Sequence, residues 1–143
     1  ALVDYAHTPD AVERVIATVK SVTHGKIIGV LGCGGDRDAS KRSVMGQALF
    51  NGCDLAIFTS DNPRSESAEA ILKQMTAGID LGKKGFVEID RKNAIDLAVK
   101  NAQSGDVVLL MGKGHESGQE VNSVVTPFDD RIELAESIRR LAR

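Results

Sequence analysis

The sequence predicts an α/β fold, a Rossmann-like and mostly parallel sheet flanked by helices with a β-hairpin near the C-terminal end. Two observations support this fold class. Short apolar runs alternate with stretches of helical periodicity, which is the pattern of βαβ units. The runs are also continuously apolar, as expected for parallel strands that are buried on both faces. The length of 143 residues fits one domain over residues 1–143.

The first half of the chain predicts two helices and one strand between them. Thr8 is suited to cap a helix that has Pro9 in its first turn and ends at Gly25. A strand over 26–32 follows, then a glycine-rich loop over 32–40 and a helix over 41–50. The inward face of the first helix is expected to carry Val12, Val15, Ile16, Val19 and Val22.

The second half predicts three further strands, a hairpin and three helices. Strands are expected over 54–59, 85–89 and 106–112. The helix after Arg64 places Ile71, Leu72, Met75 and Ile79 on one face, and Asp90 is suited to cap the helix carrying Ile95, Ala98, Val99 and Ala102. Residues 119–128 read as a hairpin around Asn122 and Ser123. Asp129 then caps a final helix that turns Ile132, Ala135, Ile138 and Leu141 inward.

Composition excludes several classes of protein. A hydrophobic content of 42% excludes a disordered chain, and the scarcity of aromatic residues predicts an aliphatic core. A net charge of −2 gives no broad basic field for nucleic acid, and no apolar run approaches the roughly 18 residues of a membrane span. Cys33 and Cys53 form no CxxC pair, so free thiols in a reducing cytoplasm are favoured over a disulfide.

Three polar loops follow the carboxyl ends of predicted strands. They read "GCGGDRDASKR" (32–42), "SDNPR" (60–64) and "GKGHE" (112–116). Ligands of open parallel sheets bind outside these strand ends, so the three loops are expected to converge on one crevice. The first loop matches neither GxGxxG nor GxxxxGK[ST], and a tight strand-to-helix turn explains its glycines as well as a phosphate site does.

The charges of these loops suit a zwitterion. Arg64 offers a planar fork for a carboxylate, and Glu116 is an anion for an ammonium group. An amino acid therefore fits better than a bare nucleotide. His115 is equally explained as a residue that hydrogen-bonds within its loop. The chain has no nucleophile elbow for a Ser/His/Asp triad, and its three scattered histidines are too few for a zinc site.

Five motifs together resemble the C-terminal domain of the Mur ligase family. "DYAHTPD", "GCGGDRD…KR", "DNPR", "GKGHE" and "PFDDR" occur in the family's order between Asp4 and Arg131. The sequence is most similar to the MurE-type UDP-N-acetylmuramoyl-tripeptide synthetases that add meso-diaminopimelate in peptidoglycan biosynthesis. The resemblance implies an ATP-dependent amide ligase, in which the terminal carboxylate of UDP-MurNAc-L-Ala-D-Glu becomes an acyl phosphate that the incoming amine attacks.

The resemblance also implies a set of site residues. Arg64 would contact the distal carboxylate of meso-diaminopimelate, which lysine lacks. The remaining substrate contacts would come from Arg42, Asp61, Asn62, Pro63, Gly112 and Glu116. Four residues match positions toward the nucleotide or the domain interface, namely Asp4, Tyr5, His7 and Arg37. It implies neither a catalytic residue nor a metal ligand in this chain.

The sequence departs from the family pattern in three places. "RDASKR" lacks the usual glycine before its Lys-Arg pair, and Ile132 stands where an acidic residue is common. The chain also lacks a GxxxxGK[ST] loop, so ATP and Mg²⁺ are expected to bind mainly to the central domain. The expected partners are an amino acid, UDP-MurNAc-dipeptide and the enzyme's own central and N-terminal domains, and the domain alone is expected to be inactive.

Other functions remain open from the sequence alone. A stand-alone α/β module that binds a phosphate or an amino acid would show the same fold. A Mur-type ligase for another amino acid such as L-lysine, another muramyl ligase or a folyl-polyglutamate synthetase would keep the reaction class. "DNPR" and "GKGHE" together favour the meso-diaminopimelate ligase.

Overall fold

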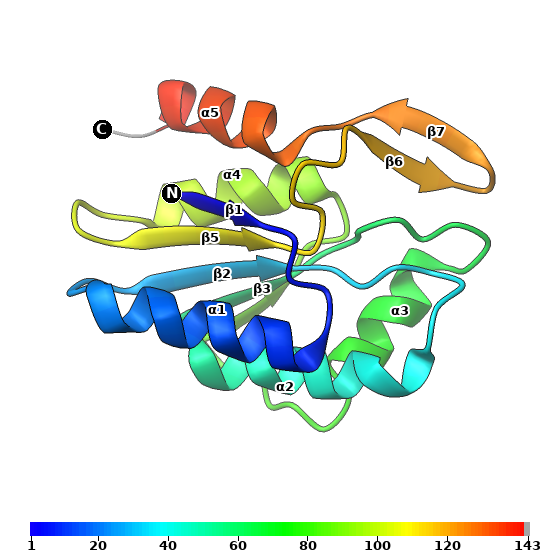
Figure 1. Cartoon of the computed structure of the whole chain (residues 1–143), viewed down its shortest axis with the longest axis horizontal. Helices are drawn as coiled ribbons and strands as arrows, with labels where there is room; N and C mark the ends of the chain where they lie inside the picture. Colours follow the sequence, from blue (N-terminus) through cyan, green and yellow to red (C-terminus); the bar gives the residue numbers. More distant parts are fainter. Residues whose placement is uncertain (142–143) are drawn as a thin grey trace.

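A five-stranded parallel sheet forms the middle layer of the structure, a computed structural model that describes residues 1–141 (Figure 1). The strand order is β1-β5-β2-β3-β4, and every neighbouring pair is parallel. The strands are β1 (Leu2–Asp4), β2 (Ile27–Leu31), β3 (Leu55–Phe58), β4 (Gly85–Val87) and β5 (Val107–Met111). This arrangement confirms the predicted fold class, because the continuous apolar runs at β2, β3 and β5 are largely buried.

Helices cover both faces of the sheet (Figure 1). α1 (Pro9–Val22), α2 (Arg42–Gly52) and α3 (Ala68–Met75) pack on one face, where their apolar side chains join those of the strands in one core cluster. α4 (Arg91–Asn101) and α5 (Asp130–Leu141) pack on the other face with a second cluster. The predicted caps Thr8 and Asp90 are confirmed, since each side chain accepts a backbone N–H of the first helical turn.

The strand order creates a switch point between β2 and β5. The chain steps from β2 to β3 to β4 in one direction and then returns to place β5 on the other side of β2. Loops that leave β2 and β5 therefore separate toward opposite faces of the sheet, and open sheets bind ligands in the crevice that this leaves. Gly32 and Gly112 directly follow these two strands.

The predicted hairpin forms and is fastened to the loop after β3. β6 (Gly118–Val121) and β7 (Val124–Pro127) are antiparallel, and Asn122 and Ser123 both have positive φ in the turn, 49° and 65°. The backbone N–H of Arg64 donates to the Glu120 carbonyl (3.0 Å), and that of Asn122 donates to the Arg64 carbonyl (2.8 Å). The hairpin thus extends over the "DNPR" loop.

Some predicted boundaries are wrong. α1 ends at Val22, before Gly25, because Thr23 adopts an extended conformation and its hydroxyl donates to the Val19 carbonyl. Val22 is accordingly 76% exposed. α3 ends at Met75, so Ile79 packs against the core from a turn rather than from the helix. The edge strand β1 was not predicted, since three residues with partial exposure give no periodic signal.

The predicted inward face of α5 is also wrong. Ile132 is 56% exposed, Ile138 is exposed, and Ala135 and Leu141 are only partly buried. The buried residues of the helix are Asp130, Leu134 and Ser137. Two of these three are polar and have hydrogen-bond partners on α4, so hydrophobic periodicity could not identify the face.

Both cysteines are buried free thiols, as the sequence favoured. Burial raises the pKa of Cys33 and of Cys53 to about 12. Within residues 1–141, no helix combines the length and the apolar character that crossing a membrane requires.

Candidate functional site

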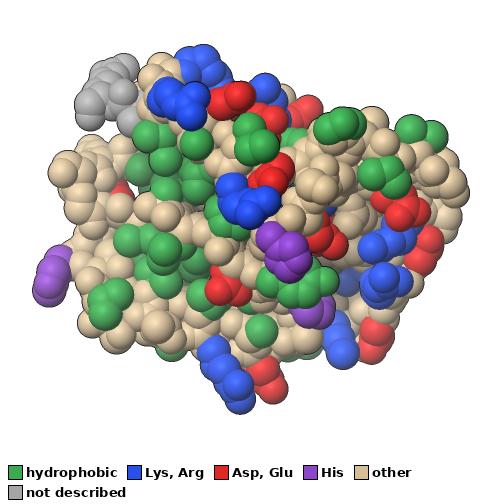
Figure 2. Space-filling view, turned by 45° about the horizontal axis from the view of Figure 1, so that its top comes forward, with side chains coloured by type: hydrophobic (Ala, Val, Ile, Leu, Met, Phe, Trp, Pro, Cys, Tyr) green, Lys and Arg blue, Asp and Glu red, His purple; other side chains and the backbone are tan. Residues whose placement is uncertain are grey.

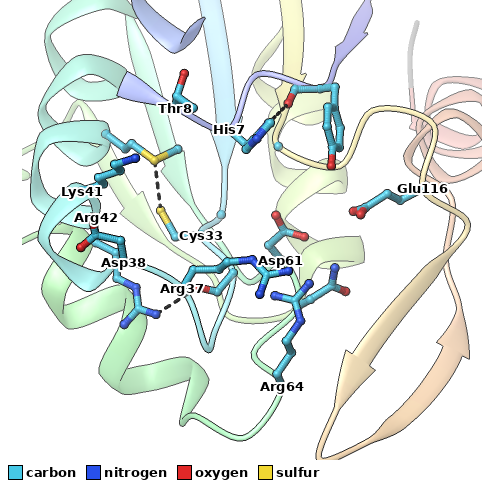
Figure 3. Close-up of a pocket in the computed structure, with 16 residues that line it drawn as sticks. His7, Thr8, Cys33, Arg37, Asp38, Lys41, Arg42, Asp61, Arg64 and Glu116 are labelled. Atoms are coloured by element: carbon cyan, nitrogen blue, oxygen red, sulfur yellow. Dashed lines mark hydrogen bonds between the residues drawn. The ribbon is translucent and has the colours of Figure 1, made fainter. Parts of the chain in front are cut away.

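A cavity of about 460 Å³ opens at the switch point, where the three predicted loops meet (Figure 3). Its walls come from the carboxyl ends of β2, β3 and β5 and from the segment between β1 and α1. Nine of the residues singled out in the sequence line it, namely Tyr5, His7, Arg37, Arg42, Asp61, Asn62, Arg64, Gly112 and Glu116. The convergence of distant loops that the parallel sheet predicts is therefore confirmed.

Two of the singled-out residues support the cavity from outside its lining. The Asp4 carboxylate accepts the backbone N–H of Ala6 (2.8 Å), and Asp4 lines a separate cavity of about 520 Å³ beside α1. The carbonyl of Pro63 accepts the N–H of Glu66 (3.0 Å) and lies against Gly35. Both residues thus fix the backbone near the site.

The glycine-rich loop and the "DNPR" loop form one wall. The N–H of Gly35 donates to the Asn62 carbonyl (2.7 Å), and Arg64 Nη1 donates to the Gly35 carbonyl (2.9 Å). The approach at Gly35 leaves no room for a side chain, because a Cβ there would lie 1.8 Å from the Pro63 oxygen. Asp36 and Arg64 hold φ of 56° and 54°, a left-handed conformation that costs free energy in a non-glycine residue.

Arg42 is buried behind this wall and its donors are largely engaged. Nη1 donates to Glu66 Oε1 (3.1 Å) and Gln74 Oε1 (2.8 Å), while Nη2 donates to the Gly34 carbonyl (3.0 Å) and Glu66 Oε2 (2.6 Å). The hydrogen bond from Arg42, followed by that from the Asp36 N–H, lowers the pKa of Glu66 to about 2. These contacts fasten the wall, and Arg42 also lines the cavity.

Arg37 and Arg64 are the arginines that offer donors to the cavity. Arg37 is exposed, and its recorded hydrogen bond is from Nη1 to the carbonyl of the neighbouring Asp36 (3.2 Å). The Arg64 side chain is 20% exposed, with Nη1 on the Gly35 carbonyl and Nε 3.8 Å from Glu120 Oε1. Figure 3 shows both guanidinium groups on the same side of the cavity as Asp61.

Two acidic side chains of the cavity are supported by a buried lysine. Asp61 and Glu116 line the cavity, and both approach Lys113, whose Nζ lies 3.4 Å from Asp61 Oδ1 and 3.7 Å from Glu116 Oε1. The Lys113 side chain is fully buried. Lys113 belongs to the "GKGHE" loop, and no hydrophobic pattern around it indicates that it is buried.

Aromatic side chains mark the rim of the cavity. The ring of Tyr5 lies 4.6 Å from that of His7 and 6.0 Å from that of His115, centroid to centroid. His7 Nδ1 is also 2.9 Å from the Tyr5 carbonyl oxygen. Figure 2 shows histidine side chains beside an apolar side chain on this face, with acidic and basic side chains interspersed around them. The face has no uniformly basic field.

A buried ion pair that the sequence did not predict holds the strand ends. Arg91 at the start of α4 donates to Asp130 at the start of α5, to the Ser60 carbonyl (3.1 Å) and to the Met111 carbonyl (3.1 Å). It therefore joins the carboxyl ends of β3 and β5 through Ser60 and Met111, the residues that directly precede Asp61 and Gly112. In the sequence, the second aspartate of "PFDDR", Asp130, was the feature that could have indicated this ion pair.

A sequence profile described as "Mur ligase, glutamate ligase domain" matches residues 1–114. The chain belongs to the Mur ligase family. Two curated relatives of this Mur ligase domain are named UDP-N-acetylmuramoyl-L-alanyl-D-glutamate--2,6-diaminopimelate ligase. That of Streptomyces coelicolor is 51% identical over 98% of the chain and 29% of the relative, and that of Geobacillus thermodenitrificans is 51% identical over 91% of the chain and 27% of the relative.

A solved structure of a ligase with the same name superimposes on the Mur ligase domain with a TM-score of 0.92 and 45% identity. The match covers 99% of this chain and 29% of the solved one, so it includes the hairpin and α5. The domain thus spans less than a third of the length of these relatives. Within residues 1–141 it has no group of three side chains that could hold a metal ion.

Proposed function

We propose that this Mur ligase domain binds the incoming amino acid of an ATP-dependent amide ligase of peptidoglycan biosynthesis, and that the amino acid is meso-diaminopimelate. Two relatives at 51% identity carry diaminopimelate in their names, and their similarity extends over nearly the whole chain. The chain spans less than a third of those relatives, so the complete reaction belongs to a longer protein.

The observation that carries the proposal is the arrangement of charges in the cavity. Arg37 and Arg64 offer donors on one side, and Asp61 and Glu116 offer carboxylates within the same 460 Å³ (Figure 3). meso-Diaminopimelate is an amino acid with an ammonium and a carboxylate at each end. In the proposed mode Arg64 binds the distal carboxylate, and Glu116 with Asp61 binds an ammonium group. L-Lysine offers no distal carboxylate to the remaining donors of Arg64 and is rejected for that reason.

The contacts of the remaining residues refine this assignment. Gly112, with φ of 108°, lets the backbone turn beside Asp61, and Asn62 presents its amide to the cavity. We assign Arg42 and Pro63 to the support of the wall, because their recorded contacts are with the protein. Tyr5 and His7 at the rim are proposed to face the nucleotide or the next domain, and Asp4 holds the segment that carries them.

The chemistry proposed for the complete ligase is amide formation through an acyl phosphate. ATP with Mg²⁺ supplies the phosphoryl group that activates the terminal carboxylate of UDP-MurNAc-L-Ala-D-Glu, and we propose that parts of the protein outside this chain bind it. The amine of the bound amino acid attacks the activated carbon, and phosphate leaves as the amide forms and the amine loses its proton. This domain orients that amine and shields the acyl phosphate from water. We place the reaction in the cytoplasm.

The test compares amino acids as substrates of the full-length ligase. The enzyme is supplied with UDP-MurNAc-L-Ala-D-Glu, ATP and Mg²⁺, and kcat/KM is measured for meso-diaminopimelate and for L-lysine. A large preference for meso-diaminopimelate supports the proposal. A preference for L-lysine keeps the ligase and contradicts the role of Arg64. If neither amino acid is ligated, a ligase for another substrate or a binding module is favoured. Turnover by residues 1–143 alone would contradict the dependence on further domains.

A further inference from the structure

We propose that Lys113 is the positioning residue of the cavity: its buried ammonium fixes the orientation of the Asn62 amide and the place of Asp61, and thereby sets the affinity for the ligand. The inference rests on the proposed function, because it concerns the same cavity. It adds a residue that does not itself line that cavity.

The donors of Lys113 are matched by three acceptors, two from the loop after β3 and one from β6. Nζ lies 2.8 Å from the Gly118 carbonyl, 3.2 Å from Asn62 Oδ1 and 3.4 Å from Asp61 Oδ1. An ammonium group has three N–H donors, so each finds one acceptor. A buried charge is tolerated only when it is paired and hydrogen-bonded, and any displacement of these oxygens therefore carries a large cost. Lys113 is fully buried, so its ammonium group is a buried charge of this kind.

This arrangement determines which way the Asn62 amide points. Asn62 Oδ1 accepts from Lys113 Nζ and from the backbone N–H of Glu120 (2.9 Å), so both of its lone pairs are engaged. A flipped amide would direct its NH₂ group at an ammonium and at an N–H donor. Nδ2 is consequently turned away from Lys113, and Asn62 lines the cavity. The side chain thus offers a donor to a ligand carboxylate.

The same lysine fastens the neighbouring acid and the hairpin. Asp61 Oδ1 faces Lys113, while Oδ2 lies close to Gly112, 3.2 Å from the place that a Cβ would occupy there. Gly118 is the first residue of β6, and Gln119 next to it donates Nε2 to the Asp61 carbonyl (2.7 Å). Lys113 therefore couples the loop after β3, the loop after β5 and the hairpin at one point.

The test uses the full-length ligase with Lys113→Met and Lys113→Gln. The methionine removes the charge at similar length, and the glutamine restores N–H donors without the charge. Lys113→Met is expected to raise the KM for meso-diaminopimelate by about tenfold or more, because this factor corresponds to the loss of one hydrogen bond to a charged group. The KM for ATP is expected to stay unchanged. Lys113→Gln is expected to recover part of this loss. Leu134→Ala, a buried change in α5, controls for lower stability.

Each outcome separates a positioning role from a structural one. The inference is overturned if Lys113→Met keeps the wild-type KM for the amino acid while its melting temperature falls as in Leu134→Ala. If Lys113→Met does not fold, Asn62→Asp replaces it, because this change keeps the acceptors for Lys113 and Glu120 but removes the Nδ2 donor. A raised KM at wild-type stability then supports the inference, and an unchanged KM overturns it. Failure of the wild-type enzyme to ligate any amino acid overturns the proposed function itself.

Discussion

Arg91 and Asp130 form a two-point ion pair across 39 positions of sequence, with Nε 2.8 Å from Oδ1 and Nη2 2.6 Å from Oδ2. Neither side chain is exposed to solvent. Because the other N–H groups of Arg91 bind the carbonyls of Ser60 and Met111, the pair joins α4 and α5 to the strand ends that carry the cavity.

Removing one partner of this pair should destabilise the domain strongly. Asp130→Ala leaves a buried guanidinium without its counter-ion, and the free energy of unfolding is expected to fall by roughly 3–5 kcal/mol. Urea denaturation of the 143-residue chain measures the change. Arg131→Ala, which breaks the more exposed pair with Asp129, is the control and should cost about 1 kcal/mol or less. Equal losses in the two variants would show that the burial of the pair is unimportant.

Arg64 should determine the choice between meso-diaminopimelate and L-lysine. Arg64→Met in the full-length ligase removes the guanidinium but keeps an unbranched side chain at the strained φ of 54°. The kcat/KM for meso-diaminopimelate is expected to fall roughly 10- to 100-fold, with little change for L-lysine, because only the first ligand pairs with the guanidinium. Arg139→Met on α5 is the control. A uniform fall for both amino acids would contradict the assignment.

Glu116 should act through substrate binding. Its side chain is 35% exposed and lines the cavity beside Lys113. Glu116→Gln removes the charge without changing the shape, so the KM for the amino acid is expected to rise about tenfold while the melting temperature stays the same. Steady-state kinetics of the full-length ligase measure this, with Glu136→Gln on the exposed side of α5 as the matched change. An unchanged KM would reassign Glu116 to the structure of its loop.

Glu66 should make stability depend on acid pH. Its pKa is about 2 in the folded chain, below the ordinary 4.5 of an unfolded chain, so the unfolded state binds more protons between these values. Stability is therefore fully present above pH 4.5 and is lost as the pH falls toward 2. Urea midpoints at pH 5 and pH 3 measure the loss. Glu66→Gln should reduce the difference between the two midpoints, and an undiminished difference would assign the acid sensitivity to other carboxylates such as Asp129.

Gly35 should tolerate no side chain. A Cβ would lie 1.8 Å from the Pro63 oxygen, so Gly35→Ala must push the glycine-rich loop away from the "DNPR" loop. Because Arg64 Nη1 binds the Gly35 carbonyl, both the melting temperature and the affinity for the amino acid are expected to fall. Gly82→Ala is the control: it meets open space, although its φ of 52° adds strain. A Gly35→Ala enzyme with normal amino-acid KM would contradict the close packing of the two loops.

Most of the fold could be predicted because its signals are local. The apolar runs at β2, β3 and β5 and the side-chain caps at Thr8 and Asp90 each lie within a few residues of the element that they define. The hairpin was visible for the same reason, since a two-residue turn needs residues that accept positive φ. β1 was missed because an edge strand of three residues depends on pairing with β5, more than 100 residues away.

The site was predictable at the level of loops and less so at the level of side chains. "GCGGDRD", "DNPR" and "GKGHE" were expected to meet because parallel strands end on one side of a sheet, and they do meet. The separate roles of Arg37 and Arg42 could not be read from the sequence. Both arginines lie in the same charged segment, and only the placement of Glu66 and Gln74 shows which one is engaged by the protein.

The sequence by itself determined the α/β class, the order of the main elements and the loops that carry the charges. These properties follow from periodicity and from turn-forming residues, which act over short distances. Tertiary structure alone decided the strand order, the buried face of α5 and the partners of Arg42, Lys113 and Arg91. The physical reason is that a charged side chain can be buried only where distant segments supply its counter-charges, and no local pattern records where those segments will lie.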